Sequence, residues 1–232
     1  MKIAIMQPYL FPYVGYFQLI NAADKFIIYD DVTFIKQGWI NRNNLLLNGK
    51  AFLFTVPLKD ASSYKPIRET EISADSRWKT KLLKTIEQAY KKAPYYGKVI
   101  GLIDEVILAE ERQIASVALK SLKTVCSYVG IDTAIIETSS NYSNNHLQSQ
   151  ARVIDICKRE RATQYINAIG GLELYSKDAF ERENIKLSFI KTETKSYKQF
   201  NNEFVPYLSI IDAMMFNSPD EIKEMLNQYE LV

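Results

Sequence analysis

The residues with the clearest chemical potential lie directly behind the first apolar run of the chain. Residues 3–5 predict a buried strand, and Gln7 then opens a segment that contains two prolines and four aromatic rings. Pro8 and Pro12 can neither donate to a sheet ladder nor sit inside a helix, so the chain must turn here. Gly15 lets the backbone approach a ligand at the start of the next helix, where free N–H groups and the helix dipole favour an anion. The other candidate ligand-binding residues of this segment are Tyr9, Tyr13 and Tyr16. The alternative is a proline-rich turn whose rings fill a core.

Two adjacent carboxylates follow the second predicted strand. Residues 25–29 form this strand, which ends at Asp30 and Asp31. A strand, a helix and a strand within about thirty residues predict a parallel pair with a right-handed crossover. Ligands of such sheets bind beyond the carboxyl ends of the strands, so Gln7 and both aspartates are expected at the same edge. Asp30 and Asp31 are therefore candidate catalytic residues, although adjacent aspartates are also common turn formers.

A cationic pair with an aromatic ring precedes a predicted hairpin. Lys36, Trp39, Asn41 and Arg42 come before residues 45–47 and 51–56, which an Asn-Gly turn connects. A guanidinium or ammonium beside a flat ring suits a phosphate or carboxylate next to a base or sugar face. The alternative is a polar loop with tryptophan as a lid.

Further candidates follow later strands. His146 is the single histidine of the chain and a possible general base, or else a polar residue at a helix start. Gly170 and Gly171 follow a predicted strand at 164–167 and could cradle an anion or form a tight turn. Gln199 and Asp212 bring an amide and a carboxylate near the last helices. The sequence contains no P-loop, nucleophile elbow or Gly-x-Gly-x-x-Gly pattern, and no metal site is expected.

The elements that must position these residues alternate between strand and helix. Predicted strands are 3–5, 25–29, 133–137, 164–167 and 185–190, with one more short strand considered around 67–72. Predicted helices begin near Phe17 and cover 76–93, 99–108, 114–129, 146–159, 175–182, 200–216 and 219–229. This order predicts an α/β protein with an open, doubly wound, mainly parallel five-stranded sheet. We expect a single domain, 1–232, with a hairpin-plus-helices insertion at 32–130 between strands two and three.

Composition narrows the class of protein. Of the 232 residues, 47% are hydrophobic and 24% charged, which is typical of a globular chain with ample core. The net charge of +2 predicts no nucleic-acid partner, and the basic run 77–92 is interpreted as a solvated helix face. Cys126 and Cys157 are expected to be small buried hydrophobes. No apolar run is long enough to span a bilayer and no signal peptide opens the chain, so a cytoplasmic protein is expected.

One set of patterns covers nearly the whole chain. Its opening block is Gln7-Pro8-Tyr9-x-Phe11-Pro12-Tyr13-x-Gly15-Tyr16, Asp24-x-Phe26, Tyr29-Asp30-Asp31 and Gly38-Trp39-Ile40-Asn41-Arg42. Later matches are Arg152-Val153-Ile154-Asp155-Ile156-Cys157, Tyr165, Gly170, Tyr175, Phe180, Tyr197-x-Gln199, Phe204 and Leu208-Ser209-Ile210-Ile211-Asp212. The set closely resembles the WbqC-like protein family, found among bacterial O-antigen and surface-polysaccharide genes. The resemblance implies an aminoacyl (glycine) or acyl transferase that acts on an amino sugar or nucleotide-sugar in lipopolysaccharide synthesis.

A fainter resemblance concerns mechanism. Tyr13-Val14-Gly15-Tyr16 is similar to the His-x-Gly-His motif of the nucleotidylyltransferase superfamily, which includes the pantoate–β-alanine ligases. It implies a nucleotidylyltransferase-like fold and ATP as a cofactor. Both histidine positions are tyrosines here, so the charge on a transferring phosphate would have to be stabilised by Lys36, Arg42 or the helix end. Nucleotidyl or adenylyl transfer and non-catalytic nucleotide-sugar binding are therefore the alternative functions.

Together these patterns assign roles to the candidates. Tyr13, Gly15 and Tyr16 would hold the donor or a nucleotide phosphate, and Lys36 and Arg42 would balance its negative charge. Asp30, Asp31 or His146 would accept the proton of the sugar amine. Gly170, Tyr175 and Gln199 would shape the acceptor pocket.

Overall fold

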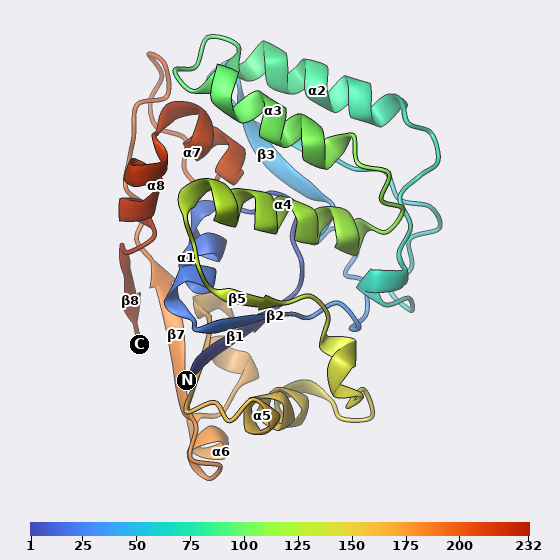
Figure 1. Cartoon of the computed structure of the whole chain (residues 1–232), viewed down its shortest axis with the longest axis vertical. Helices are drawn as coiled ribbons and strands as arrows, with labels where there is room; N and C mark the ends of the chain where they lie inside the picture. Colours follow the sequence, from blue (N-terminus) through green and yellow to red (C-terminus); the bar gives the residue numbers. More distant parts are fainter.

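A mainly parallel sheet lies at the centre of the computed structural model, which describes residues 1–232 (Figure 1). Its strands are β1 (Lys2–Met6), β2 (Lys25–Ile28), β5 (Ala134–Ile136), β6 (Gln164–Ala168), β7 (Lys186–Thr192) and β8 (Tyr229–Leu231). They are ordered β5-β2-β1-β6-β7-β8, and every pair is parallel except β7 with β8. The predicted α/β class and the parallel sheet are confirmed.

Both faces of the sheet are covered, because the central strands are apolar on both sides. Ile3 and Ile5 pack into one hydrophobic cluster, whereas Ala4 between them packs into the other. The first cluster lies under α5 (Ser149–Arg159) and α6 (Lys177–Glu181), and the second under α1 (Val14–Ala22) and α4 (Ile114–Val129). Such alternation on buried strands is what a doubly wound sheet requires.

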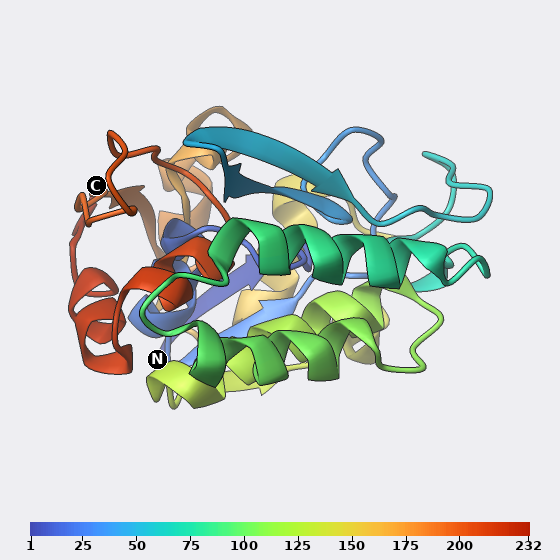
Figure 2. The same ribbon diagram turned by 90° about the horizontal axis from the view of Figure 1, so that it is seen from above.

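A hairpin and three long helices separate β2 from β5. The hairpin pairs β3 (Arg42–Leu47) with β4 (Lys50–Thr55) as a separate two-stranded sheet. After the short 3₁₀ helix η1 (Ile67–Glu69) come α2 (Arg77–Tyr90), α3 (Tyr96–Ile107) and α4. Figure 2 shows α2 lying beside the hairpin, with the other two helices below it. Gly130, with φ +76°, ends α4 as a left-handed cap, as its position predicts.

The carboxyl-terminal region differs most from the prediction. The predicted helix 200–216 begins only as α7 (Ile210–Phe216), because Phe200 and Tyr207 have φ values of +54° and +56° that a helix excludes. The predicted helix 219–229 is shortened to α8 (Pro219–Met225), since the chain then pairs with β7 as β8. This sixth strand was missed because its three residues carry no periodicity.

Smaller corrections concern element starts. The strand considered around 67–72 is instead η1, and the predicted helix 146–159 starts at Ser149. Two further 3₁₀ helices, η2 (Ser139–Tyr142) and η3 (Ile169–Leu174), follow β5 and β6. The predicted helix 175–182 is reduced to α6.

The two cysteines occupy opposite sides of the sheet. Cys126 of α4 lies in the cluster with α1, and Cys157 of α5 in the other. Both thiols are free, and burial raises the pKa of each to about 12. None of the helices has the length and apolar character needed to cross a membrane.

Candidate functional site

The strand order marks one edge of the sheet as the place for a ligand. β1 lies between β2 and β6. After β1 the chain first adds β2 and β5 on one side of it, and later adds β6, β7 and β8 on the other side, so the strand order reverses at β1. In open α/β sheets, ligands bind in the crevice outside the carboxyl ends of the strands at such a reversal point. Gln7, Tyr29, Glu137 and Ile169 begin the segments that follow β1, β2, β5 and β6 at this edge.

The segment after β1 forms a fixed elbow. The Tyr16 hydroxyl donates to the Gln7 carbonyl at 2.7 Å, which closes the elbow back on its own start. At its tip, Phe11 has φ +42°, and its carbonyl accepts hydrogen bonds from Asn43 Nδ2 at 2.8 Å and Ser209 Oγ at 2.7 Å. The elbow is therefore held by the hairpin and by the start of α7, and its rings are set in place before any ligand arrives.

An aromatic cleft opens beside the elbow. It has a volume of about 160 Å³ and is lined by Tyr9, Pro12, Tyr13, Trp39, Asn43 and Tyr207. Trp39 and Tyr207 are 44% and 64% exposed, so their rings are accessible at the mouth. The sequence predicted Tyr9, Tyr13 and Trp39 as ligand-binding residues, and the structure brings these three together. Asn43 and Tyr207 were missed, because nothing in their local sequence marks them.

A second, smaller cavity lies behind Tyr13. It has a volume of about 30 Å³ and shares Tyr13 and Tyr207 with the aromatic cleft. A Cβ added at Gly15 would lie 2.4 Å from Tyr13 Cε2 and 2.5 Å from Thr192 Oγ1. The space beside Gly15 is thus filled by the chain itself, and a nucleotide phosphate does not fit there unless the Tyr13 ring moves. Burial raises the pKa of the Tyr13 hydroxyl, so it is a neutral donor.

The predicted cation pair has a different arrangement from the expected one. Arg42 donates from Nε to the Gly38 carbonyl at 2.9 Å and from Nη2 to the Gln37 carbonyl, while its guanidinium lies 5.5 Å from the Trp39 ring centre. Arg42 therefore fixes the loop that carries Trp39. Lys36 is exposed and pairs with no carboxylate. Asn41 is buried and donates to the Val56 carbonyl at 2.8 Å, so it holds the hairpin base.

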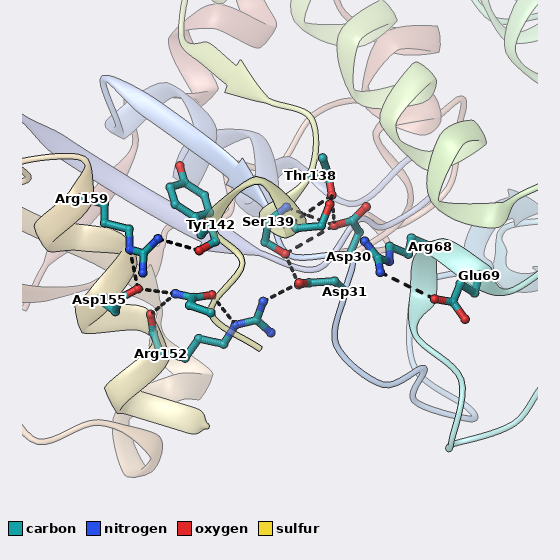
Figure 3. A network of polar contacts seen from close by, with 12 residues as sticks. Asp30, Asp31, Arg68, Glu69, Thr138, Ser139, Tyr142, Arg152, Asp155 and Arg159 are labelled. Atoms are coloured by element: carbon teal, nitrogen blue, oxygen red, sulfur yellow. Dashed lines mark hydrogen bonds and ion pairs between the residues drawn. The ribbon is translucent and has the colours of Figure 1, made fainter. Parts of the chain in front are cut away.

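The two predicted aspartates belong to a buried polar network at the ends of β2 and β5 (Figure 3). Asp31 Oδ2 pairs with Arg152 Nη2 at 2.5 Å, and its other oxygen accepts from Ser139 Oγ. Arg152 also donates from Nε to Asn144 Oδ1 at 3.0 Å and lies over the Tyr29 ring at 4.9 Å. The Asp31 carboxylate is thus committed to an ion pair, whose arginine was not among the predicted site residues.

Asp30 keeps one oxygen unengaged. Its Oδ1 accepts from Thr138 Oγ1 at 2.8 Å and from the Ser139 backbone N–H at 3.1 Å, whereas Oδ2 has no partner among the contacts in Figure 3. Burial raises the pKa of Asp30 against the lowering effect of these hydrogen bonds. A buried carboxylate with a raised pKa and a free oxygen is equipped to accept a proton. Neither aspartate is among the residues that line the aromatic cleft.

The remaining candidates are dispersed. His146 lies in an exposed turn ahead of α5. Gly170 and Gly171 lie in η3, where a Cβ at Gly171 would be 2.4 Å from Asn167 Nδ2. Tyr175 packs edge-on against Tyr165 at 5.6 Å, on the α5 side of the sheet.

Asp212 and Gln199 hold the loop that carries Tyr207. Asp212 is fully buried and accepts hydrogen bonds from Tyr197 at 2.6 Å, Gln199 at 2.7 Å and Tyr90 at 3.0 Å. Gln199 also accepts from the Val205 N–H at 2.7 Å and donates to its carbonyl at 3.1 Å. These two residues therefore act on the aromatic cleft indirectly, by fixing residues 193–209.

The structure is an open α/β sheet with an aromatic cleft beside the segment that follows its central strand β1. The chain belongs to the WbqC-like protein family, whose model matches residues 7–224. It is 28% identical over 228 residues to the uncharacterized protein Rv1507c of Mycobacterium tuberculosis, an alignment that covers 97% of each chain. No solved structure matches the chain. No group of three or more His, Cys, Asp or Glu residues is placed to hold a metal ion.

Proposed function

We propose that the protein is a transferase that binds an amino sugar, free or as a nucleotide-sugar, in the aromatic cleft and attaches an acyl or aminoacyl group to it. The observation that carries the proposal is the cleft itself, with Tyr9, Tyr13, Trp39 and Tyr207 around about 160 Å³ at the carboxyl edge of the sheet. Tyrosine and tryptophan offer an apolar ring face together with a polar group, which suits the two kinds of surface of a sugar ring.

The size of the cleft supports one ring rather than a whole nucleotide-sugar. Sites for drug-sized ligands enclose about 300–1,000 Å³, so the cleft would hold the sugar and leave a nucleotide outside it. Trp39 and Tyr207 at the mouth are exposed enough to contact that outer part.

Asp30 is the preferred proton acceptor of the three predicted bases. It does not line the cleft, so the sugar amine would have to extend out of the cleft toward it. Its Oδ2 is free, whereas Asp31 is paired with Arg152 and His146 lies in an exposed turn. In the proposed step the sugar nitrogen forms a bond to the acyl carbon of an activated ester or thioester. The bond from that carbon to the leaving oxygen or sulfur breaks, and Asp30 transfers the amine proton to the leaving group.

Of the two alternative functions, one is supported by a contact in the structure and the other is opposed by one. A non-catalytic sugar-binding protein is favoured by the full engagement of Asp31 in its ion pair. Nucleotidyl transfer would require Tyr13 to leave the space beside Gly15, so it needs a rearrangement that sugar binding does not.

Binding is tested by tryptophan fluorescence. The chain has two tryptophans, so a Trp78→Phe variant makes Trp39 the sole reporter. We expect nucleotide amino-sugars to change its emission saturably. A Tyr9→Ala substitution should weaken this binding at least tenfold, and Tyr64→Ala, which removes a 95% exposed ring elsewhere, should not. No saturable change with any sugar would contradict the assignment of the cleft.

Turnover is tested separately by mass spectrometry. The protein is incubated with nucleotide amino-sugars and either glycine with ATP or a charged tRNA, and the acylated sugar is measured. Asp30→Asn should abolish product and leave fluorescence binding within about twofold. Binding without product in the wild type would support the non-catalytic alternative, and release of pyrophosphate with nucleotide attached to substrate would support nucleotidyl transfer.

A further inference from the structure

A row of exposed cations lies along the outer face of α2. The helix buries Leu82 and Ile86 on its inner face. Arg77, Lys81 and Lys84 are exposed on the opposite face, one helical turn apart, and the exposed Lys91 and Lys92 follow the end of the helix. We call these five residues the α2 cation row. Figure 2 shows α2 at the outside of the molecule, next to the β3–β4 hairpin.

Two shallow, open hollows lie along this row, and we call them together the trough. One, of about 640 Å³, lies between the end of α2, the Asn48–Gly49 turn of the hairpin and Asn202. The other, of about 460 Å³, lies over the first half of α2 and has no hydrophobic lining residue. Lys84 and Gln88 line both hollows, so the two adjoin on the outer face of α2, a helix about 21 Å long.

Positive charge dominates the trough. Arg77 pairs with Asp75 at 2.6 Å and Lys91 with Glu87 at 3.1 Å. Lys81, Lys84 and Lys92 pair with no carboxylate of the chain, and lysines one helical turn apart repel one another. The chain as a whole has a net charge of only +2, so this concentration of cations is local. An anionic partner would relieve the repulsion.

We propose, against the expectation from the net charge, that the trough is a docking surface for the phosphate backbone of a nucleic acid. Backbone recognition uses arginine and lysine together with hydroxyl and amide side chains, and Thr80, Thr85, Gln88 and Asn48 provide these between the cations. The row is long enough to meet several successive phosphates. The proposal does not depend on the aromatic cleft.

Two other anionic partners fit the surface less well. A membrane-binding helix carries large apolar side chains on its exposed face, whereas the apolar residues that line the trough, Leu46, Ala89 and Phe200, are buried or half-buried at its hairpin end. A protein interface depletes charged residues at its centre, whereas Lys84 lies in the middle of the trough. The exposed, mainly polar and basic lining therefore favours a phosphate chain.

The test measures binding of fluorescein-labelled unacylated tRNA and of a 20-base-pair DNA duplex by anisotropy, from 50 to 200 mM salt. Four or five neutralised phosphates predict a slope of log affinity against log salt of about −3 to −4.5. The triple variant Lys81→Gln, Lys84→Gln, Lys92→Gln should lose at least tenfold in affinity and have a shallower slope. Arginine at the same three positions should restore both.

The control variant carries Lys2→Gln, Lys177→Gln and Lys186→Gln, an equal charge change at exposed lysines on other elements. It should keep wild-type affinity within about twofold. Equal losses in both triple variants, or no binding of either probe at 50 mM salt, would overturn the proposal. Binding only to vesicles with anionic lipid would assign the trough to a membrane instead. Preference for tRNA over the duplex, or the reverse, identifies which nucleic acid fits.

Discussion

Arg152 connects three parts of the chain at the carboxyl edge of the sheet. Its guanidinium binds Asp31 after β2 and Asn144 ahead of α5, and covers the Tyr29 ring. Both side chains of the ion pair are at most 7% exposed, so little water screens them. A buried charged side chain that loses its partner still carries its full desolvation penalty, with no ion pair to offset it.

We therefore expect Arg152→Met to lower the free energy of unfolding by about 3–5 kcal/mol. Adding Asp31→Asn should recover part of this loss, because the uncompensated charge is removed. Urea denaturation of the two single variants and the double variant measures the coupling. The control is Arg159→Met, which removes the more exposed pair with Asp155 and one hydrogen bond to the Tyr142 carbonyl and should cost about 1–2 kcal/mol. Equal costs at the two arginines would contradict the interpretation.

Gly15 offers a second prediction at the scale of single residues. Gly15→Ala places a methyl group within 2.5 Å of both Tyr13 and Thr192, and we expect a loss of about 1–3 kcal/mol. Tyr13→Ala in the same chain should relieve part of it. The matched control is Gly101→Ala in α3, which meets no neighbour and should stabilise by about 0.5–1 kcal/mol. Urea denaturation checks both, and a neutral Gly15→Ala would show that the Tyr13 ring moves freely.

Among the elements, the irregular segment 193–209 depends on a carboxylate outside it. Asp212, in the first turn of α7, binds Tyr197 and Gln199 of this segment and Tyr90 of α2. Burial raises the pKa of Asp212, and the hydrogen bonds lower it by less. The same segment places Tyr207 at the aromatic cleft. The Asp212 carboxylate therefore shapes the aromatic cleft although it does not line it.

The stability of the protein should vary with pH through Asp212. Because its pKa in the folded protein is above that of an ordinary aspartate, its contribution to stability is greatest at low pH and is lost as pH rises through the folded pKa. Asp212→Asn removes this dependence. The unfolding free energy of the wild type minus that of the variant should therefore fall between pH 3.5 and pH 7. Urea titrations at several pH values test this, with exposed Asp132→Asn as control. A constant difference would contradict it.

The elements that the sequence predicted well are those with strong periodicity. Helix α4 was predicted with its bounds and its Gly130 cap, and the parallel strands follow from apolar runs between helices. The start of α7 and strand β8 were missed, because they depend on partners distant in sequence. Within the site, the elbow and Trp39 were predicted from local composition. Tyr207 and Arg152 were not, because only the folded chain brings them to β1 and β2.

At the scale of the molecule, the order of strands brings the candidate residues to one edge. Segments that begin near residues 7, 30, 138 and 169 meet there although they are far apart in the sequence. The aromatic cleft is built from the elbow, the β3–β4 region and the segment before α7. A ligand in this cleft contacts three separate stretches of chain, so its binding should stabilise the whole fold.

A sugar ligand at 100 times its dissociation constant should add about 2.7 kcal/mol of stability. For a chain of this size this corresponds to a rise in Tm of about 5–10 °C. Differential scanning fluorimetry with a panel of amino sugars and nucleotide-sugars measures it. Trp39→Ala should remove the shift, and Tyr64→Ala should preserve it. A ligand-induced rise in Tm that persists in Trp39→Ala would show that the ligand binds outside the aromatic cleft.

The two free cysteines can report on the opening of the two hydrophobic layers of the molecule to solvent. Cys126 and Cys157 lie in separate hydrophobic layers, and neither thiol reacts while it stays shielded from solvent. Timed alkylation followed by peptide mapping would reveal whether the two layers open to solvent together or separately. Matching labelling rates would mean that the sheet and both its coverings come apart in a single cooperative event.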